Sequence, residues 1–482
     1  MLPTNAALRS QVAEVALEIS SMETRLEEKR AELQRLQHQL DAVTYPVLSL
    51  PPEITSEIFI HCLPSLQLRP DGVDPMQVPL LVSHVCSQWR RIAISTPLLW
   101  RELNIDLGIR RRQGSDIVDT WLARAQHCPL SVRIRGLVLD LVDSARFFEA
   151  FRRHAWKMQS LELEIHMEDF EEMEKPMPEF PLLRELSLSS ADGWTLLNES
   201  LDKMFADVPQ ISQVRLCYFP AKVDMVALPW DQLQKFTGEF YELSECLEAL
   251  RLMPNIVECT FSVHETVVED DSHQMVSHSQ LRTFTLFQSK PLDEDEAVPR
   301  SAQLLALITF PNLETLQLLD IEDYDAQALA SFLGRGSPPL KRLVIRPHLR
   351  PGQTDLVLTM TPLLQPHFKN LEIWYPEKGF ASRFFERLSQ DSEFVPGLEM
   401  LSFYCRSRKK EASRRDLLAI AAESLNKRRD LTGVNQLRVF RAMVAAEKVS
   451  PWSHADALVP FRRLEQEGLD VQSGLQRSRN EI

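Results

Sequence analysis

Apolar residues near the start of the chain recur at alternating steps of four and three. The series is Leu8, Val12, Val15, Ile19, Met22, Leu26, Leu33, Leu36, Leu40 and Val43, with Lys29 at its one polar position. A seven-residue repeat with apolar a and d positions is typical of a coiled-coil helix. Val12 and Leu26 are a positions, and Lys29 is a d position. We therefore predict a coiled-coil helix over residues 1–44.

The charges beside this seam bear on its partner. In a parallel homodimer, each g position faces the e position five residues further along the partner. This would set Glu18 against Glu23 and Arg25 against Arg30, two pairs of like charge. The charges therefore disfavour a parallel pair. A single helix that packs on the rest of the chain, or on another protein, remains an alternative.

Residues 45–104 carry three short apolar stripes at helical spacing. The first consists of Ile54, Ile58 and Cys62, widened by Phe59; the second of Leu81, Val85, Trp89 and Ile92; the third of Leu98, Leu99, Trp100 and Leu103. Pro51 and Pro52 suit the start of the first helix, and Glu53 suits its positive end. Three helices this short cannot bury so much apolar surface among themselves, so a partner surface is expected.

This segment resembles the F-box. The matching residues are Leu50-Pro51-x-Glu53-Ile54, Val85-Cys86-x-x-Trp89-Arg90 and Leu99-Trp100. With the preceding coil and the leucine-rich body that follows, nearly the whole chain resembles a family of F-box proteins abundant in mushroom-forming (basidiomycete) fungi. An unrelated three-helix module is the alternative.

The resemblance implies that the F-box binds the adaptor subunit of SCF-type cullin–RING ubiquitin ligases, and the cullin through that adaptor. The predicted adaptor-binding residues are Leu50, Pro51, Glu53, Ile54, Ile58, Phe59, Val85, Trp89 and Trp100.

Beyond the F-box-like segment one template recurs, in which apolar residues occupy the first, fourth and sixth positions. Its copies begin at Met158, Leu183, Ile211, Leu233, Ile256, Leu281, Leu313, Leu340, Phe368, Leu398 and Val434. This spacing is typical of leucine-rich repeats, in which each copy gives a short strand and the copies stack into a solenoid. The Asn or Cys that standard repeats carry three places after the template is missing, which leaves the regularity and curvature open. An ordinary α/β domain with parallel strands is the alternative.

We therefore predict an α/β solenoid of irregular leucine-rich repeats over residues 158–446. Residues 105–157 would form a connector and a first αβ unit, with a helix over Ile117–Ala125 and a strand over Leu130–Ile134. Residues 447–482 would form a C-terminal cap or tail.

Residues that flank the inner template leucines face the open side of the sheet. They are acidic in early copies and threonines in the middle, whereas late copies carry arginines and aromatic residues. Residues 341–482 hold 24 Lys and Arg against 17 Asp and Glu. We predict a site for an acidic or phosphorylated target protein, formed by Arg342, Arg346, Trp374, Tyr404 and Arg438, with Phe440 beside them. Alternatively, the C-terminal tail folds back through Trp452, Phe461 and Leu464 and buries these aromatic residues.

Composition excludes several other functions. Seven scattered cysteines without a C-x-x-C pair predict neither a disulfide framework nor a zinc site. With 14 glycines in 482 residues, the chain has no glycine-rich phosphate loop. The net charge of −14 disfavours nucleic acid and anionic membranes as partners. The N-terminal residues lack a secretion signal and no apolar run is long enough for a membrane span, so we expect a cytoplasmic or nuclear protein.

The sequence offers no catalytic group. His264, His273 and His278 lie near acidic residues but lack metal-ligand spacing, so we interpret the stretch as a solvated loop. We predict no cofactor, no metal and no catalysis. The predicted function is that of a substrate-receptor subunit of a ubiquitin ligase, with an unidentified target. The alternative is a coiled-coil and leucine-rich-repeat scaffold that acts without a ligase.

Overall fold

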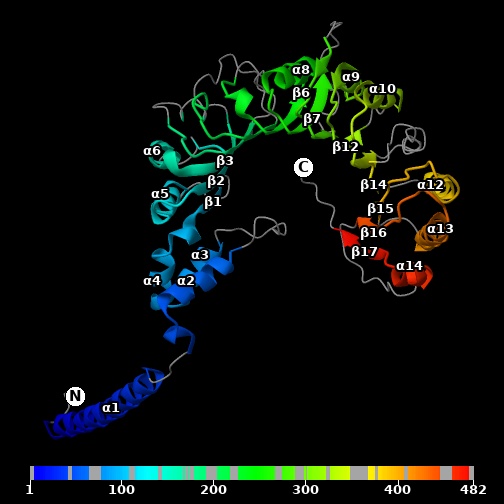
Figure 1. The fold of residues 1–482 in the computed structure, drawn as a ribbon. Coiled ribbons are helices and arrows are strands. Elements are labelled where there is room, and N and C mark those ends of the chain that lie inside the picture. The colour runs from blue at the N-terminus through cyan, green and yellow to red at the C-terminus, as the bar shows by residue number, and fades with distance from the viewer. Residues whose placement is uncertain are drawn as a thin grey trace. The chain divides into compact units, whose positions relative to one another are not determined.

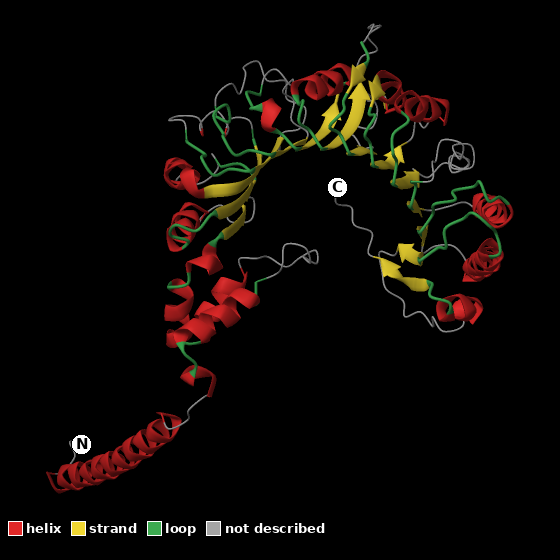
Figure 2. Cartoon of the chain, viewed as in Figure 1, coloured by secondary structure: helices red, strands yellow, loops and turns green. Residues whose placement is uncertain are grey.

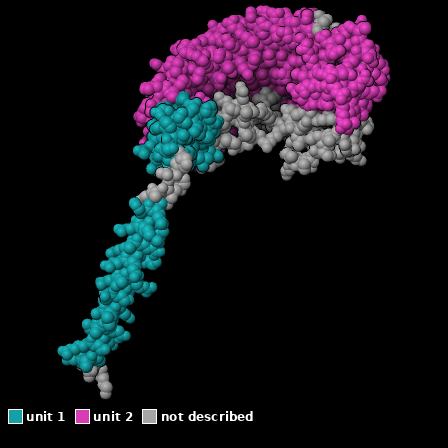
Figure 3. Space-filling model, turned by 60° about the horizontal axis from the view of Figure 1, so that its bottom comes forward, with its two compact units in different colours: residues 1–100 teal, residues 101–482 magenta. Residues whose placement is uncertain are grey.

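The structure is a computed structural model of the chain. It describes residues 5–41, 46–63, 77–107, 114–138, 144–166, 169, 173, 178–190, 204–217, 226–265, 274–287, 298–299, 301–321, 326–347, 367–374, 378–406, 411–445 and 459–476. The chain divides into two compact units, residues 1–100 (unit 1) and residues 101–482 (unit 2) (Figure 3).

Unit 1 begins with helix α1 (Asn5–Asp41), which is 37 residues long. No Pro or Gly interrupts it, and it is rich in Ala, Leu, Glu and Arg, which favour helix. The side chains of residues 5–39 are exposed throughout. The predicted helix is present as far as Asp41, while Val43 lies outside the described residues.

In the described remainder of unit 1 there are five further short elements: η1 (Pro46–Ser49), α2 (Pro52–His61), α3 (Gln77–Val85), α4 (Ser87–Ile94) and η2 (Pro97–Trp100). Cys86 separates α3 from α4, and its Sγ accepts a hydrogen bond from the Trp89 backbone N–H at 3.4 Å, which caps α4. Phe59 and Trp100 are buried. The rings of Phe59 and Trp89 meet edge to face at 4.9 Å, and Trp100 Nε1 donates to the Ala93 carbonyl at 2.8 Å.

Two details of the predicted three-helix segment are wrong. Its second stripe is not part of one helix, because α3 ends at Val85 and α4 begins at Ser87. Leu81 and Val85 are exposed on α3, whereas Ile92 is buried on α4. Its third helix is a single 3-10 turn that ends at Trp100. The chain then turns into a strand of unit 2, which contains Leu103.

Unit 2 is built on one long sheet in which fourteen of the described strands run parallel, in chain order. These strands are β1 (Glu102–Asp106), β2 (Leu130–Arg135), β3 (Met158–Ile165), β4 (Glu185–Ser190), β5 (Gln213–Cys217), β6 (Lys235–Tyr241), β7 (Glu258–Glu265), β9 (Thr283–Phe287), β12 (Thr315–Ile321), β13 (Arg342–Pro347), β14 (Asn370–Trp374), β15 (Met400–Arg406), β16 (Val439–Ala445) and β17 (Asp470–Gln476). Strand β10 (Val298–Pro299) pairs antiparallel with β7, and β8 (Val276–Ser277) pairs with β11 (Ile308–Thr309).

Helices lie along one side of this sheet, and the sheet curves so that its other face is on the inside (Figures 1 and 2). They are α5 (Gly114–Arg124), α6 (Ser144–His154), α8 (Leu243–Leu252), α9 (Ser301–Leu307), α10 (Ala326–Gly336), α12 (Lys378–Gln390), α13 (Glu411–Arg429) and α14 (Arg462–Gln466), with 3-10 turns η3 (Ala155–Lys157), η5 (Trp230–Gln232) and η8 (Val459–Phe461). Unit 2 is therefore an α/β solenoid-like repeat fold, as the template predicted.

The core of unit 2 lies between the sheet and these helices. Template residues alternate with outward-facing residues along each strand, so the inner leucines are buried. A row of phenylalanines runs through the middle of this core, with successive ring centroids 5.8, 6.5, 4.9 and 5.8 Å apart. Its members are Phe236, Phe261, Phe284, Phe310 and Phe332.

Both ends of the predicted array need correction. The array begins at β1, one strand earlier than predicted, because β1 pairs in parallel with β2. It also continues past residue 446, since η8, α14 and β17 add a further unit whose strand pairs with β16. The last predicted copy is shifted by three residues: Phe440 pairs with Leu401 and Ala442 with Phe403, so this copy begins at Leu437 rather than Val434.

Two asparagines connect neighbouring units through side-chain hydrogen bonds, and both lie before the strand of their unit. Asn255 Nδ2 donates to the Asp231 carbonyl and Asn312 Nδ2 to the Ser279 carbonyl, each at 2.8 Å. Both asparagines precede the first template residue of their copy. Their side chains donate hydrogen bonds to turn carbonyls of the preceding unit. In standard repeats the Asn or Cys that follows the template has this role, and that residue is missing here.

Candidate protein-interaction surfaces

Unit 1 exposes apolar side chains on two neighbouring helices. On α2, Ile54 is 51% exposed and Ile58 44%. On α3, Leu81 is 64% exposed and Val85 61%. Each pair is spaced by four residues, so its members lie on one face of their helix. We call these four residues the apolar surface of unit 1.

The structure divides the predicted adaptor-binding residues into two groups. Ile54, Ile58 and Val85 belong to the apolar surface, and Pro51 and Glu53 beside them are also exposed. The remaining residues, Leu50, Phe59, Trp89 and Trp100, are partly or fully buried. Phe59 and Trp100 therefore shape the unit from inside, and any effect they have on a partner is indirect. Leu81 was not predicted as a surface residue, because periodicity places it in an apolar stripe without showing which side of the stripe is covered.

The face of the unit 2 sheet away from the helices, here called the open face, carries rows of side chains in register. One row lies between the two inner template leucines: Arg133, Glu162, Ser187, Arg215, Thr237, Thr260, Thr285, Gln317, Val344, Glu372, Ser402, Arg441 and Gln472. A second row follows the second inner leucine and includes Arg135, Glu164, Ser189, Cys217, Glu239, Phe287, Leu319, Arg346, Trp374 and Tyr404. Its character changes from charged to apolar and aromatic along the array.

Three members of the second row form what we call the arginine–aromatic cluster: Arg346, Trp374 and Tyr404. The rings of Trp374 and Tyr404 are stacked, with centroids 4.0 Å apart and planes 10° apart. The Arg346 guanidinium carbon lies 5.8 Å from the centroid of the Trp374 ring, within the range of a cation–π interaction. Burial, and then the nearby Glu372 carboxylate, raise the pKa of the Tyr404 hydroxyl.

Carboxylates connect this cluster to Arg342. Arg342 Nη2 lies 3.0 Å from Glu372 Oε2, and Glu372 Oε1 accepts a hydrogen bond from Trp374 Nε1 at 2.8 Å. Arg346 pairs with Asp320 at 2.5 Å. Four of the five predicted target-binding residues therefore lie together. These four side chains are not all available to a target, because each arginine is paired with a carboxylate and Tyr404 is only 6% exposed.

Arg438 does not belong to this group. Arg438 lies just before β16, at the edge of the sheet where the strands begin. A row of charged residues, connected from unit to unit by backbone hydrogen bonds, follows this edge: Arg282, Glu314, Lys341, Lys369, Glu399 and Arg438. Glu399 contacts Lys369 at 3.0 Å and Arg438 at 3.7 Å. In the same row a hydrogen bond from Lys341 lowers the pKa of Glu314. The shifted copy explains the error, because it moves Arg438 off the open face.

The predicted fold-back of the C-terminal segment occurs on the other face of the sheet. Phe461 and Leu464 are buried, and the Phe461 ring stacks on Phe440 at 5.2 Å. Phe440 is an inner template residue and faces the helices, so this contact leaves Trp374 and Tyr404 uncovered by Phe461. The predicted contribution of Trp452 lies outside the described residues.

One group of reactive side chains lies on the open face. Cys217 Sγ donates to Glu239 Oε1 at 3.1 Å, and Arg215 Nη2 lies 2.7 Å from the same oxygen. Burial, followed by the Glu239 carboxylate, raises the pKa of the Cys217 thiol. Since the thiolate is the nucleophile, this cysteine is a poor one.

The described residues contain no group of three or more His, Cys, Asp or Glu side chains able to hold a metal ion. His278, predicted to lie in a solvated loop, is instead buried, with Nε2 2.8 Å from the Met253 carbonyl oxygen.

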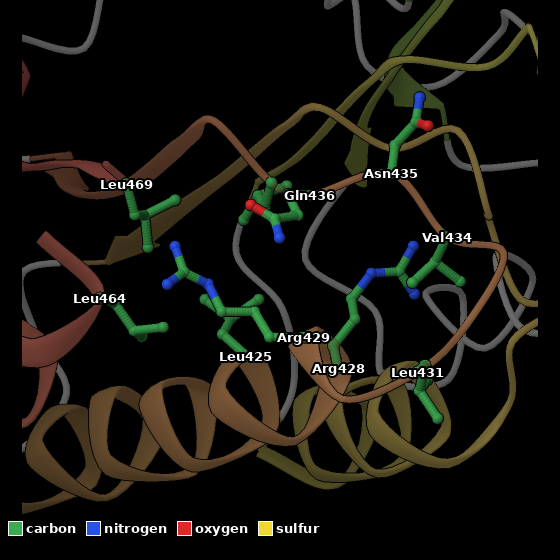
Figure 4. Close-up of a pocket in the computed structure, with 10 residues that line it drawn as sticks. Leu425, Arg428, Arg429, Leu431, Val434, Asn435, Gln436, Leu464 and Leu469 are labelled. Carbon is green, nitrogen blue, oxygen red and sulfur yellow. The ribbon is translucent and has the colours of Figure 1, made fainter. Parts of the chain in front are cut away.

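A small cavity of about 80 Å³ lies between the end of α13, the turn before β16 and α14 (Figure 4). Arg428 lines it and donates through Nη to the carbonyls of Leu388, Phe394 and Val395 at 3.3, 3.2 and 2.7 Å. Burial lowers the pKa of Arg428 to about 10, so it stays charged at neutral pH. Arg429, beside it, pairs with Glu467. These contacts hold the α12–β15 connection and the last unit together, which is a structural role.

The fold and the two surfaces define an α/β solenoid-like repeat protein with candidate sites for protein partners. No family model matches the chain, and neither does any curated protein. A comparison with solved structures matches part of the chain to the crystal structure of a Bacteroides fragilis protein that was a structural genomics target. The two are 14% identical over 67% of this chain and 76% of that one, with a TM-score of 0.31. Among the described helices, none is both long and apolar enough to cross a membrane.

Proposed function

We propose that this chain is a substrate-receptor subunit of an SCF-type cullin–RING ubiquitin ligase, of the F-box type found in mushroom-forming fungi. The F-box-like helices of unit 1 bind the adaptor, and the open face of unit 2 binds a target protein. The chain performs no bond chemistry. It holds target lysines near a charged conjugating enzyme and so raises their effective concentration.

The observation that carries this proposal is the apolar surface of unit 1. Unit 1 has a core of its own around Phe59 and Trp100, yet Ile54, Ile58 and Leu81 stay exposed. Exposed apolar groups of this kind mark a surface that a partner covers. Ile54 also belongs to the Leu50-Pro51-x-Glu53-Ile54 match to the F-box.

The arginine–aromatic cluster, with Arg342, supports the second half of the proposal. Arg, Trp and Tyr are the residue types that contribute most to protein–protein binding. Arg342 is paired with Glu372 but remains 45% exposed in its side chain, so it can exchange this carboxylate for one on a target. A phosphate or carboxylate group accepts two parallel hydrogen bonds from a guanidinium. The target class that fits is an acidic or phosphorylated protein segment.

The test uses the full chain and a purified SCF adaptor. Changing both Ile54→Ala and Ile58→Ala removes about 2 kcal/mol of apolar burial, so adaptor binding should weaken roughly 30-fold in calorimetry or surface plasmon resonance. The matched control changes Leu252→Ala and Met275→Ala, two exposed apolar residues of unit 2, and should bind as wild type does. Equal adaptor affinity for both variants, or no binding by the wild type, would contradict the proposal.

A second candidate function follows from α1. Its apolar seam is exposed along the helix, which favours a scaffold that joins partners through a coil and a repeat body. A chain that binds no adaptor but still associates through α1 would support the scaffold function over the ligase function.

A further inference from the structure

Helix α1 presents an apolar seam to solvent. Ile19, Met22, Leu26, Leu33 and Leu36 are between 49% and 60% exposed, and they follow the alternation of a and d positions. We propose that this seam binds the seam of a second copy of the chain, with the two helices antiparallel. The proposal does not depend on adaptor binding.

Like charges oppose the parallel arrangement. It would bring Glu18 against Glu23 and Arg25 against Arg30, twice each by symmetry. It would also place Lys29 directly opposite Lys29 of the second copy, in the same layer of the core. An apolar layer cannot hold two facing ammonium groups, because each would lose its water without gaining a partner.

In an antiparallel pair, a positions face d positions of the other helix. One alignment brings Ile19 opposite Leu36, Met22 opposite Leu33, and Leu26 opposite Lys29 of the second copy. Its twofold axis passes between Glu27 and Glu28. The same contacts repeat on the other side of the axis, so the described part of the helix provides six consecutive core layers.

The charges beside these layers are complementary in this alignment. Antiparallel helices set e against e and g against g of the partner. Here Glu23 faces Arg30 of the second copy, and Arg25 faces Glu32 of the second copy. The two residues of each pair are not level with each other but lie two residues, about 3 Å, apart along the helix axis. Symmetry doubles both pairs, so four pairs of opposite charge flank the core.

The neighbouring alignments lack this match. Sliding one helix by a heptad toward its N-terminus places Arg25 against Arg25 and Glu23 against Glu23 of the second copy. Sliding it by a further heptad restores one favourable pair but sets Arg9 against Arg30, and it shortens the overlap. Charge therefore selects a single alignment as well as a direction.

Lys29 fits the chosen alignment. Its Nζ lies 2.5 Å from Glu32 Oε2 one turn further along the same helix, so the ammonium group points toward the flank of the seam. Its aliphatic stem can then cover Leu26 of the second copy while the charge stays in water. Glu32 also faces Arg25 of the second copy, so it joins the two helices. A single polar position in an otherwise apolar seam commonly fixes alignment at some cost in affinity.

The first experiment measures the mass of the full chain by light scattering or sedimentation. We expect a dimer of twice 55.4 kDa. The double change Glu23→Lys plus Arg25→Glu makes all four antiparallel pairs repulsive at unchanged net charge. It should raise the dissociation constant of the antiparallel dimer at least about 30-fold. The same change places opposite charges at the two parallel contacts, position 23 with Glu18 and position 25 with Arg30, so any dimer that remains should show the short label distance of a parallel pair. Adding Arg30→Glu and Glu32→Lys restores opposite charges in all four pairs and should restore the dimer.

The second experiment measures direction. A spin label is introduced as an unnatural amino acid at Leu17, which is 73% exposed and lies outside the seam. In the proposed alignment, residue 17 faces residue 38 of the second copy, so the labels should lie about 30 Å apart along the axis. A parallel pair would hold them within about 20 Å of each other.

A monomeric wild type, or a label distance of the parallel kind, would overturn the inference. So would a dimer that persists when residues 1–44 are removed, because a different surface would then hold it. A double variant with the affinity and label distance of the wild type would also contradict it. None of these outcomes bears on adaptor binding, so failure here and failure of the proposed function are distinguishable.

Discussion

The apolar surface of unit 1 and the arginine–aromatic cluster of unit 2 differ in what already occupies them. Ile54 and Ile58 expose aliphatic side chains to water. In the cluster, Arg346 pairs with Asp320, and Trp374 stacks on Tyr404. A partner of unit 1 gains affinity by removing apolar groups from water, whereas a partner of the cluster must compete with contacts that exist in its absence. The first surface suits a constant partner and the second suits a partner that binds conditionally.

The largest expected effect is the difference in stability loss between a buried and an exposed residue of α2. Phe59→Ala empties a buried site against Trp89 and should cost about 3–5 kcal/mol of the unfolding free energy of unit 1. Its sequence neighbour Ile58→Ala should cost less than about 1 kcal/mol, because Ile58 is exposed. Chemical denaturation of both variants, followed by circular dichroism, checks this. Similar losses would mean that Ile58 belongs to the core and not to a binding surface.

The cluster should show an intermediate effect. Trp374→Ala removes the stacked ring, the cation–π contact and the hydrogen bond to Glu372, so we expect unit 2 to lose about 1–3 kcal/mol of stability. The same variant should lose target binding. Thermal unfolding measures the first effect. An unchanged melting temperature would show that the cluster is not preassembled as described.

Salt should separate the two surfaces by mechanism. Raising ionic strength from about 0.1 to 0.5 M screens charges but not apolar burial, so target binding should weaken several-fold while adaptor binding changes little. Titrations of each partner at both salt concentrations make the comparison. An adaptor affinity that falls as steeply as target affinity would remove the distinction.

Arg438 should show the smallest effect. Its side chain is 77% exposed and 3.7 Å from Glu399, so Arg438→Ala should change unfolding free energy by less than about 0.5 kcal/mol. Because Arg438 lies off the open face, target binding should also stay at the wild-type level. A clear loss of binding would place the target across the starting edge of the strands.

The sequence predicted the strands of unit 2 well, because a buried strand repeats its apolar residues at fixed spacing. The template failed near β16, where residues beginning at Val434 and at Leu437 both fit it. Only the pairing of Phe440 with Leu401 decides between them. Leu81 was not among the predicted binding residues for a related reason: a stripe that binds a partner is as apolar as a stripe that packs in the core. Periodicity cannot distinguish the two.

The partners of the arginines could not be predicted either. Asp320 and Glu372 come from neighbouring units, 26 and 30 residues away from Arg346 and Arg342 in the sequence. Their proximity depends on strand register and on a register shift between Leu319 and Ile321. A side chain can be placed on a face from sequence alone, but its partner across strands cannot.

The row of phenylalanines from Phe236 to Phe332 has a consequence for how unit 2 unfolds. Rings of neighbouring units contact one another along this row, so the free energy of one unit depends on its neighbours being folded. Nearest-neighbour coupling of this strength makes the middle of the array open as one cooperative block. Among the described strands, β17 has a neighbour on one side only, so it can open without the rest. Backbone amides of β7 and β9 should therefore exchange with solvent most slowly, and those of β17 much faster.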